Sequence, residues 1–174
     1  MIDQLTHKET TFQKKKFPII LLLDNVMGEA NLGSVFRLAD AFGINKIIFC
    51  RTAPNLKSNR LRRTARNTYN TVKHEFHEDP VEVLEDLHTN GYTSTAIEIT
   101  SSSKPMQMFE LQNQENFVLV AGNERHGISS EVLSLCKHFY HIEMFGENSS
   151  MNVAQSVGIA LYEITKAFNK FDKK

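Results

Sequence analysis

The chain has 174 residues, 41% of them hydrophobic and 23% charged, and its net charge is zero. These values are typical of an ordinary globular protein with one domain, long enough to bury a full core without disulfides or structural metal ions. No apolar run approaches the ~20 residues that span a bilayer, and Met1 to Leu5 lack the basic-then-apolar pattern of a signal peptide. We therefore expect a cytoplasmic protein with no membrane partner.

The first predicted elements form a strand, a helix and a second strand. The apolar run at 17–23 predicts a buried strand. Apolar residues then recur at helical spacing between Asn31, the expected N-cap, and Gly43, the expected C-terminal stop. Residues 44–50 predict the second strand. Strand, helix and strand within about 34 residues make a βαβ unit, so the sheet should be parallel and buried.

The rest of the chain continues this alternation of strands and helices. Three more strands are predicted at 92–99, 117–120 and 139–144. Three more helices are predicted, from Asp79-Pro80 to Gly91, at 131–137 and at about 152–168. The expected fold class is α/β, a three-layer sandwich around a parallel sheet of about five strands. The domain should cover 17–174, after a polar N-terminal extension at 1–16 that includes one short helix.

Positive charge gathers in one part of the chain. Between Ala41 and His74 there is no Asp or Glu, whereas eight residues are Lys or Arg. We expect residues 51–74 to form a long loop with a short helix at 58–66, and loops of this length are usually functional. Because a local positive field binds polyanions, we predict an RNA-facing surface here. Its contact residues should be Lys57, Arg60, Arg62, Arg63 and Arg66.

Several common kinds of site find no support in the sequence. Cys50 and Cys136 lie in apolar contexts without CxxC spacing, so they should be reduced core residues. The seven histidines are scattered, and we expect no metal. A Ser-His-Asp arrangement, a GxSxG elbow, a GxGxxG motif and a P-loop are all missing from the sequence.

Two glycine- and amide-rich loops follow predicted strands. The first, Gly122–Gly127, reads GxExxG, and the second, 146–152, leads into the last helix. Parallel α/β sheets bind ligands at the carboxyl ends of their strands, so both loops should hold a cofactor. At least one of the polar residues at the start of the last helix should cap it, while its free N–H groups could also bind an anion. These residues are Ser149, Ser150 and Asn152.

Three motifs follow one another along the chain: the first is Asn31 to Gly43 with Arg37 inside it, the second is 119–128 and the third is 142–154. In this order they resemble the SpoU/TrmH family of RNA ribose 2′-O-methyltransferases, within the SPOUT class. The resemblance extends over nearly the whole chain. Its third motif departs from the family pattern, because the family usually has Pro, Leu and Ser where this chain has Glu143, Met151 and Ala154.

The resemblance implies both a function and a set of site residues. It implies a homodimer that binds S-adenosylmethionine in a deep C-terminal trefoil knot and methylates a ribose 2′-hydroxyl in structured tRNA or rRNA. The family's functional polar positions match Arg37, Asn31, Glu124, Ser150 and Asn152. The cofactor contacts correspond to Gly122, Ile142 and Met151, together with Ala96 at the end of the third predicted strand.

The high pKa of an arginine side chain limits the roles that Arg37 can have in the reaction. An arginine with a pKa above about 12 is a poor general base at neutral pH, so we expect it to bind a phosphate and stabilise the developing alkoxide. A phosphate oxygen would then take the proton. Glu124 suits the orientation of Arg37 or another cation, and Asn31 or a partner across the dimer could hold Arg37. Two alternatives stay open: an RNA-binding relative without catalysis, and a SPOUT methyltransferase that modifies a base.

Overall fold

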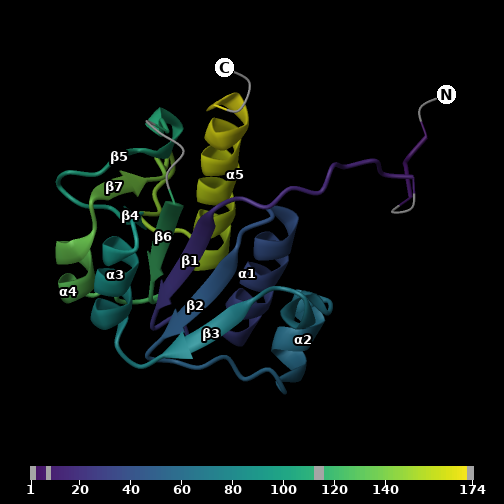
Figure 1. Ribbon diagram of the computed structural model, residues 1–174, viewed down its shortest axis with the longest axis horizontal. Helices are drawn as coiled ribbons and strands as arrows, with labels where there is room; N and C mark the ends of the chain where they lie inside the picture. Colours follow the sequence, from purple (N-terminus) through teal and green to yellow (C-terminus); the bar gives the residue numbers. More distant parts are fainter. Residues whose placement is uncertain (1–2, 7–8, 112–115, 172–174) are drawn as a thin grey trace.

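The protein, seen in a computed structural model that describes residues 3–6, 9–111 and 116–171, contains one parallel sheet (Figure 1). Its strand order is β3-β2-β1-β6-β4-β7-β5, and every recorded pair is parallel. The strands are β1 Ile19–Asp24, β2 Lys46–Cys50, β3 His74–His77, β4 Tyr92–Ile97, β5 Lys104–Pro105, β6 Asn116–Gly122 and β7 His138–His141. The prediction of a parallel α/β fold is confirmed.

Five α-helices and two short 3-10 turns accompany the strands in the described part of the chain. The helices are α1 Glu29–Ala41, α2 Asn59–Ala65, α3 Pro80–Thr89, α4 Ser130–Leu135 and α5 Val153–Phe171. The 3-10 turns are η1 Thr68–Asn70 and η2 Met106–Met108. Each predicted helix of the domain is therefore present, including the short one expected at 58–66. None of the described helices is long and apolar enough to cross a membrane.

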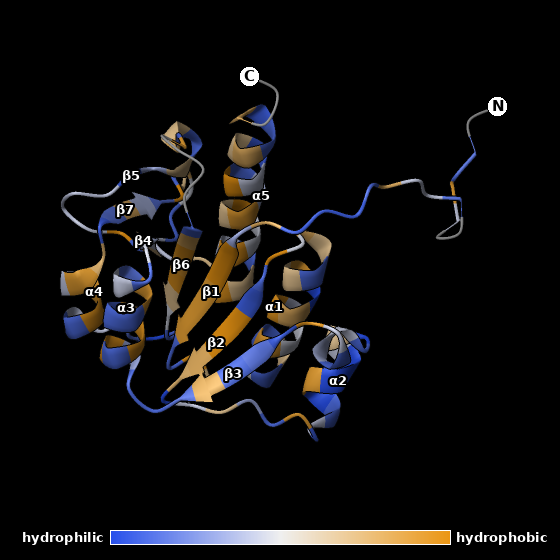
Figure 2. Ribbon diagram, viewed as in Figure 1, coloured by the Kyte–Doolittle hydropathy of each residue, from blue (hydrophilic) through white to orange (hydrophobic). Residues whose placement is uncertain are grey.

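The sheet lies between two helical layers, as a three-layer sandwich requires. In β1, Ile19, Leu21 and Leu23 pack in one core with residues of α1, α2 and α5. Ile20 and Leu22, which point to the other face, pack in a second core with residues of α3 and α4. Figure 2 shows the central strands as the most hydrophobic part of the fold. Burial on both faces explains why these strands are continuous apolar runs in the sequence.

The structure corrects several sequence predictions at the edges of elements. Strands β3 and β5 were not predicted, because β3 is a half-exposed edge strand of sequence HEFH and β5 has only two residues. Strand β7 ends at His141 and not at residue 144. The N-cap of α1 is Gly28, so Asn31 lies inside the first turn and the prediction that it caps this helix is wrong. The described parts of 1–16, residues 3–6 and 9–16, contain no helix.

Helices α1 and α2 pack in unusually close contact. A Cβ atom at Gly33 of α1 would lie 1.9 Å from the Thr64 Oγ1 atom of α2, so only glycine fits there. The Ser58 hydroxyl, which caps α2, also donates a hydrogen bond of 2.5 Å to Glu29 Oε2 at the start of α1. This contact places the basic helix directly beside the helix that carries Asn31 and Arg37.

Candidate active site

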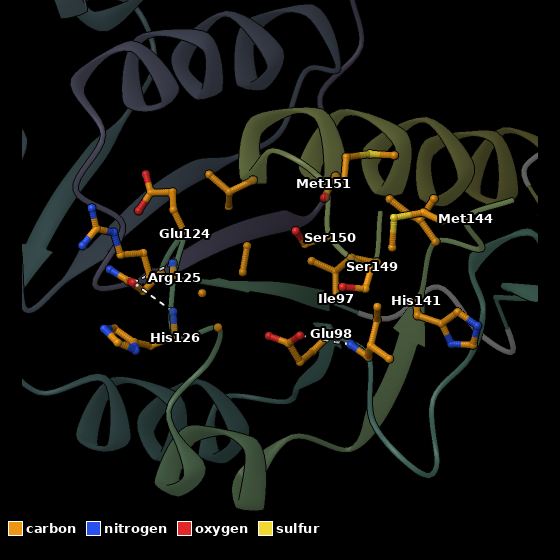
Figure 3. A pocket seen from close by; sticks show the side chains of 18 residues that line it. Ile97, Glu98, Glu124, Arg125, His126, His141, Met144, Ser149, Ser150 and Met151 are labelled. Carbon is orange, nitrogen blue, oxygen red and sulfur yellow. Dashed lines mark hydrogen bonds between the residues drawn. The ribbon is translucent and has the colours of Figure 1, made fainter. Parts of the chain in front are cut away.

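A cavity of about 330 Å³ opens at the carboxyl ends of β4, β6 and β7 (Figure 3). Both predicted loops line it, so the prediction that they form one pocket is confirmed. Its walls combine apolar side chains with carboxylates, hydroxyls and backbone. The lining residues used below are Ile97, Glu98, Gly122, Glu124, Ile142 and Met151, with Ser149 and Ser150 at the rim that leads to α5.

The GxExxG loop, residues Gly122–Gly127, is held in a closed turn by its own backbone. Asn123 and Gly127 exchange two backbone hydrogen bonds of 2.9 Å. The Asn123 Oδ1 atom accepts from the backbone N–H groups of Arg125 and His126 at 3.0 and 3.2 Å. A Cβ atom at Gly122 would lie 2.2 Å from backbone atoms of Gly127 and Ile128, so this tight return of the chain requires glycine. The loop therefore presents its backbone to the cavity in a fixed shape.

Glu98, which the sequence interpretation missed, ties β4 to the end of this loop. Its Oε2 atom accepts a hydrogen bond of 3.1 Å from the Ile128 backbone N–H, and Oε1 accepts one of 3.1 Å from the Ile99 N–H. The carboxylate lines the cavity (Figure 3). In the sequence, Glu98 lies between two isoleucines inside a predicted strand, so nothing in the pattern distinguished it from an outward-facing strand residue.

The segment 142–151 forms the opposite wall and is much more exposed. Phe145 is 93% exposed and Met151 37%. Between Ile142 and Met151, the only hydrogen bond recorded in the described structure joins Gln107 to Glu143, one of the three residues that depart from the family pattern. Gly146 has no atom within 4 Å of the position of a Cβ. This wall therefore has little support from the rest of the chain.

Three of the predicted polar residues form one hydrogen-bonded cluster at the edge of the cavity. The Asn31 Nδ2 atom donates to Glu124 Oε1 at 2.9 Å, and Asn152 Nδ2 donates to Asn31 Oδ1 at 2.8 Å. Asn152 Oδ1 also accepts from the N–H groups of Ala154 and Gln155, which confirms the prediction that a polar residue caps α5. The cluster joins α1, the GxExxG loop and α5, which are far apart in the sequence.

Glu124 is further bonded to the backbone at the start of α1. Its carboxylate accepts hydrogen bonds from the Gly28 and Met27 N–H groups at 2.9 and 3.3 Å. Partial burial raises the pKa of Glu124, but the hydrogen bonds from Asn31 and from backbone N–H groups outweigh burial and lower the pKa below its ordinary value. Glu124 is therefore an ionised carboxylate at neutral pH, positioned beside the positive end of α1.

Arg37 lies apart from this cluster. It is exposed on α1, and no hydrogen bond or ion pair of its side chain is recorded in the described part of the chain. Asn31 and Glu124 bond to each other, to Asn152 and to the backbone, and no contact of either with Arg37 is recorded among the described residues. The alternatives, a partner across the dimer for Arg37 and another cation for Glu124, stay predictions. A free guanidinium can bind an external anion without first breaking an internal ion pair.

Ala96 does not line the cavity, contrary to prediction. Its side chain is fully buried in the core shared with α3 and α4. Side chains alternate across a strand, so the next residue, Ile97, faces the other layer and lines the cavity. Ala96 and Ile97 are one residue apart on β4, and a shift of one residue along a strand moves a side chain to the other face of the sheet.

The predicted RNA-binding residues are all exposed on or beside α2. They are Lys57, Arg60, Arg62, Arg63 and Arg66. None forms an ion pair within the residues that the structure describes, although Arg62 Nε donates to the Leu56 carbonyl and its guanidinium stacks over Tyr69. Two other basic residues from the acid-free stretch are paired: Lys46 with Glu75, and Arg51 with Asp24 and Glu131. Those two are excluded from the basic surface.

Neither cysteine belongs to the cavity. Cys50 and Cys136 are buried and free, as predicted, and burial raises the pKa of each thiol to about 12. Across the described residues, no group of three or more His, Cys, Asp or Glu side chains is placed to hold a metal ion.

The fold and the cavity together define a parallel α/β ligand-binding protein whose site lies at the carboxyl edge of its sheet. Comparison with known families shows which family the chain belongs to. A model of the SpoU rRNA Methylase family matches residues 18–162, and the chain belongs to this family. The resemblance seen in the three sequence motifs is thereby confirmed.

Relatives and solved structures agree with this assignment. The chain is 27% identical over 160 residues to a tRNA (guanosine(18)-2′-O)-methyltransferase of Aquifex aeolicus, covering 92% of this chain and 74% of the relative. It is 28% identical to the 23S rRNA (guanosine-2′-O-)-methyltransferase RlmB of Pasteurella multocida, covering 91% and 64%. The crystal structure of the A. aeolicus TrmH/SpoU tRNA modifying enzyme matches with a TM-score of 0.80 at 26% identity, covering 91% and 79%.

Proposed function

We propose that this protein transfers a methyl group from S-adenosylmethionine to the 2′-hydroxyl of a ribose in tRNA or rRNA. The observation that carries the proposal is the family match over 18–162 to a chain whose motif loops form one cavity beside an unpaired arginine. The related enzymes of A. aeolicus and P. multocida are named as methyltransferases of tRNA and of 23S rRNA, respectively. These two substrates differ, so the class of RNA is left as tRNA or rRNA.

The cavity has the dimensions and groups that S-adenosylmethionine needs. Its volume of about 330 Å³ suits a ligand of this size, and Ile97 and Ile142 offer apolar surface to an adenine ring. We assign cofactor contacts to Gly122, Ile142 and Met151, with Ile97 in the place predicted for Ala96. The Glu98 carboxylate can accept hydrogen bonds from the hydroxyl or amino groups of the cofactor. When bound, the cofactor supplies an electrophilic methyl on a sulfonium.

The residues of the chain then position and activate the ribose. Arg37, free and exposed on α1, binds the adjacent phosphate and stabilises the oxyanion as the hydroxyl loses its proton, which a phosphate oxygen accepts. Asn31, Glu124 and Asn152 fix α1 and α5 against the GxExxG loop, and Ser150 offers a hydroxyl at the rim. The roles of these five residues are therefore divided between one anion-binding group, three positioning groups and one rim contact.

The exposed basic residues of α2 form the proposed RNA surface. Because α2 packs directly on α1, RNA bound there lies beside Arg37. Phosphate contacts supply most of the affinity for structured RNA and make it salt-dependent.

The same proposal includes a homodimer, a C-terminal trefoil knot and a cytoplasmic location. The knot is part of the proposal because of the family match over 18–162.

The direct test is methylation in vitro. The protein is incubated with labelled S-adenosylmethionine and total RNA from a strain that lacks it, and the nucleosides are then analysed. We expect label in 2′-O-methylated nucleosides at one position. Label in a base would support the alternative SPOUT activity, and RNA binding without any label would support an inactive relative.

Arg37→Ala tests the catalytic assignment. We expect turnover to fall by about 10²- to 10³-fold, because oxyanion stabilisation is removed, while the affinity for S-adenosylmethionine stays unchanged. Single-turnover assays and calorimetry measure the two quantities. The control, Lys170→Ala, removes an exposed positive charge near the C-terminal end of α5, outside the cavity lining, and should keep wild-type turnover. Wild-type turnover in Arg37→Ala would refute the role.

The basic surface is tested by replacing Arg60, Arg63 and Arg66 together with alanine. Each phosphate contact that is lost should lower the slope of log affinity against log salt by about 0.7 to 0.9. Cofactor affinity should not change. A control triple variant at Lys104, Lys137 and Lys170 removes the same charge from exposed positions elsewhere. Equal RNA affinities of the two triple variants would rule out α2 as the RNA surface.

A further inference from the structure

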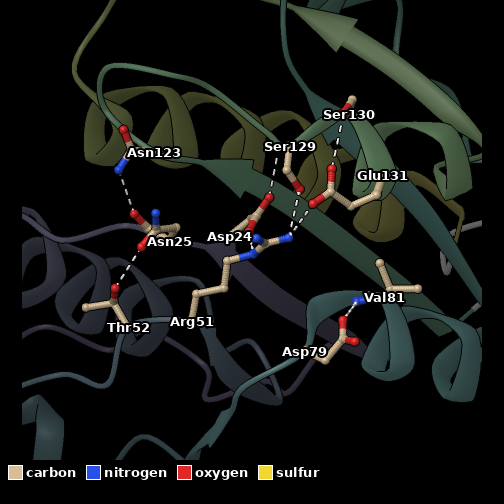
Figure 4. A network of polar contacts seen from close by, with 10 residues as sticks. All are labelled: Asp24, Asn25, Arg51, Thr52, Asp79, Val81, Asn123, Ser129, Ser130 and Glu131. Carbon is tan, nitrogen blue, oxygen red and sulfur yellow. Dashed lines mark hydrogen bonds and ion pairs between the residues drawn. The ribbon is translucent and has the colours of Figure 1, made fainter.

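We propose that Arg51 is a positioning residue: with Asp24, it holds the GxExxG loop in the shape that receives the cofactor. The inference rests on the proposed function, because it names the residues that position the same cavity. Arg51 was first counted among the basic residues of the RNA-facing segment. Its guanidinium instead points to the carboxyl end of β1 and the start of α4 (Figure 4).

Asp24, the last residue of β1, is a buried carboxylate with two partners. Only 2% of its surface is exposed. The Asp24 Oδ2 atom accepts a hydrogen bond of 2.9 Å from the Ser129 backbone N–H, just beyond the GxExxG loop. The Arg51 Nε atom lies 3.1 Å from Oδ1, which has no hydrogen bond of its own. The charge of Arg51 is therefore what compensates the burial of this oxygen.

Arg51 also reaches the start of α4, which follows the loop. Its Nη2 atom lies 2.7 Å from Glu131 Oε1 and 3.4 Å from Ser129 Oγ. One guanidinium thus connects the end of β1 and the beginning of α4, and the distance between these two elements sets where the loop closes. A planar guanidinium with several donors suits such a junction better than a flexible ammonium.

A second connection fixes the other end of the loop. The Asn123 Nδ2 atom donates a hydrogen bond of 2.7 Å to the Asn25 carbonyl, and Thr52 Oγ1 donates one of 2.7 Å to Asn25 Oδ1. Asn123, inside the loop, and Ser129, just beyond it, are therefore both bonded to Asp24 and Asn25 at the end of β1. That pair is in turn bonded to the two residues that follow β2 (Figure 4).

The backbone at this junction has two residues in the left-handed region. Arg51 has a φ of +66°, which costs a residue of its type free energy, and Asn25, a residue type that adopts this region more readily, has a φ of +57°. Such residues persist where the surrounding interactions over-determine the conformation, and they gather at functional sites. Here the conformation of Arg51 directs its side chain to Asp24 and Glu131.

The experiment compares Arg51→Met, just after β2, with Lys46→Met, a matched control at the first residue of β2. Lys46 also forms an ion pair, with Glu75, but it lies at the opposite end of β2 and is not among the residues that line the cavity. We expect Arg51→Met to raise the dissociation constant and the KM for S-adenosylmethionine by about tenfold, because a buried charge loses its partner. The kcat and the KM for RNA should stay within about twofold, as they should for Lys46→Met.

Two further variants separate positioning from folding. Arg51→Lys keeps the charge and should recover part of the cofactor affinity. If Arg51→Met does not fold, the double variant Asp24→Asn/Arg51→Met removes the buried charge while it keeps an acceptor for Ser129. We expect that variant also to bind the cofactor about tenfold more weakly, because the connection to α4 is lost. Wild-type affinity in a folded Arg51→Met, or in the double variant, would overturn the inference. A wild-type protein that does not bind S-adenosylmethionine would instead refute the proposed function.

Discussion

The two walls of the cavity are built in opposite ways. The GxExxG loop is closed by its own backbone, anchored at both ends to β1, and held to β4 by Glu98. The segment 142–151 has one recorded hydrogen bond among the described contacts, and its Phe145 side chain is almost fully exposed. A site with one preformed and one weakly supported wall gains order when the ligand fills it. We therefore expect the first wall to set the geometry, and the second to gain order when the cofactor binds.

Glycines in the two walls give the largest expected difference. At Gly122 a Cβ atom would collide with backbone at 2.2 Å, whereas at Gly146 it would meet nothing within 4 Å. We expect Gly122→Ala to lower the free energy of unfolding by about 3 kcal/mol, because backbone cannot move aside as a side chain can, and to abolish cofactor binding. Gly146→Ala should change stability by less than about 0.5 kcal/mol. Urea unfolding measures the free energy of unfolding of each variant, and calorimetry measures its cofactor binding. Similar results for the two variants would contradict a rigid first wall.

Hydrogen exchange compares the walls without mutation. S-adenosylmethionine should slow amide exchange in 142–151 by about tenfold or more, because binding supplies contacts that this segment lacks. Amides in 122–127 should change much less, since most are already bonded. Adenosine, which lacks the sulfonium and amino acid parts, serves as the control ligand. Equal protection of both walls would show that they are equally ordered before binding.

The same contrast explains what the sequence could predict. Apolar runs such as 17–23 identified the buried central strands, and glycine with amide side chains identified both loops. The half-exposed strand β3 was missed, because its sequence HEFH has neither alternation nor an apolar run. The family resemblance implied Ala96 as a cofactor contact, and no sequence pattern at the end of a doubly buried strand reveals that Ile97 is the residue that faces the cavity.

Long-range polar contacts were beyond prediction for a different reason. The bond from Asn31 to Glu124 spans 93 residues, and the one from Asn152 to Asn31 spans 121. The motifs showed that these residues belong together, but not that Asn31 bonds to Glu124 and not to Arg37. Glu98 and Arg51 had no motif at all. Glu98 and Arg51 reach their partners because they lie at the carboxyl ends of strands. Which strand ends lie side by side depends on the order of the strands in the sheet, which the sequence does not show.

The smallest expected effect is a pH dependence of the preformed wall. Hydrogen bonds from Asn31 and the backbone lower the pKa of Glu124 despite partial burial. A carboxylate whose pKa is lower in the folded state stabilises the fold above its unfolded pKa, about 4.3 for glutamate. That contribution is lost as the pH falls through the lower, folded-state pKa. Glu124→Gln removes it, so the stability difference between wild type and variant should be constant near neutral pH and shrink below about pH 4.3.

Thermal unfolding from neutral pH to about pH 3 measures this difference across the glutamate range. The control is Glu147→Gln in the segment 142–151, an exposed position with no recorded contact in the described structure. Because Glu147 bonds to nothing there, its replacement should leave the pH dependence of stability as in the wild type. If both variants change the pH dependence of stability equally, Glu124 acts only through net charge. If Glu124→Gln alone changes it, the carboxylate stabilises the start of α1 against the GxExxG loop before any cofactor binds.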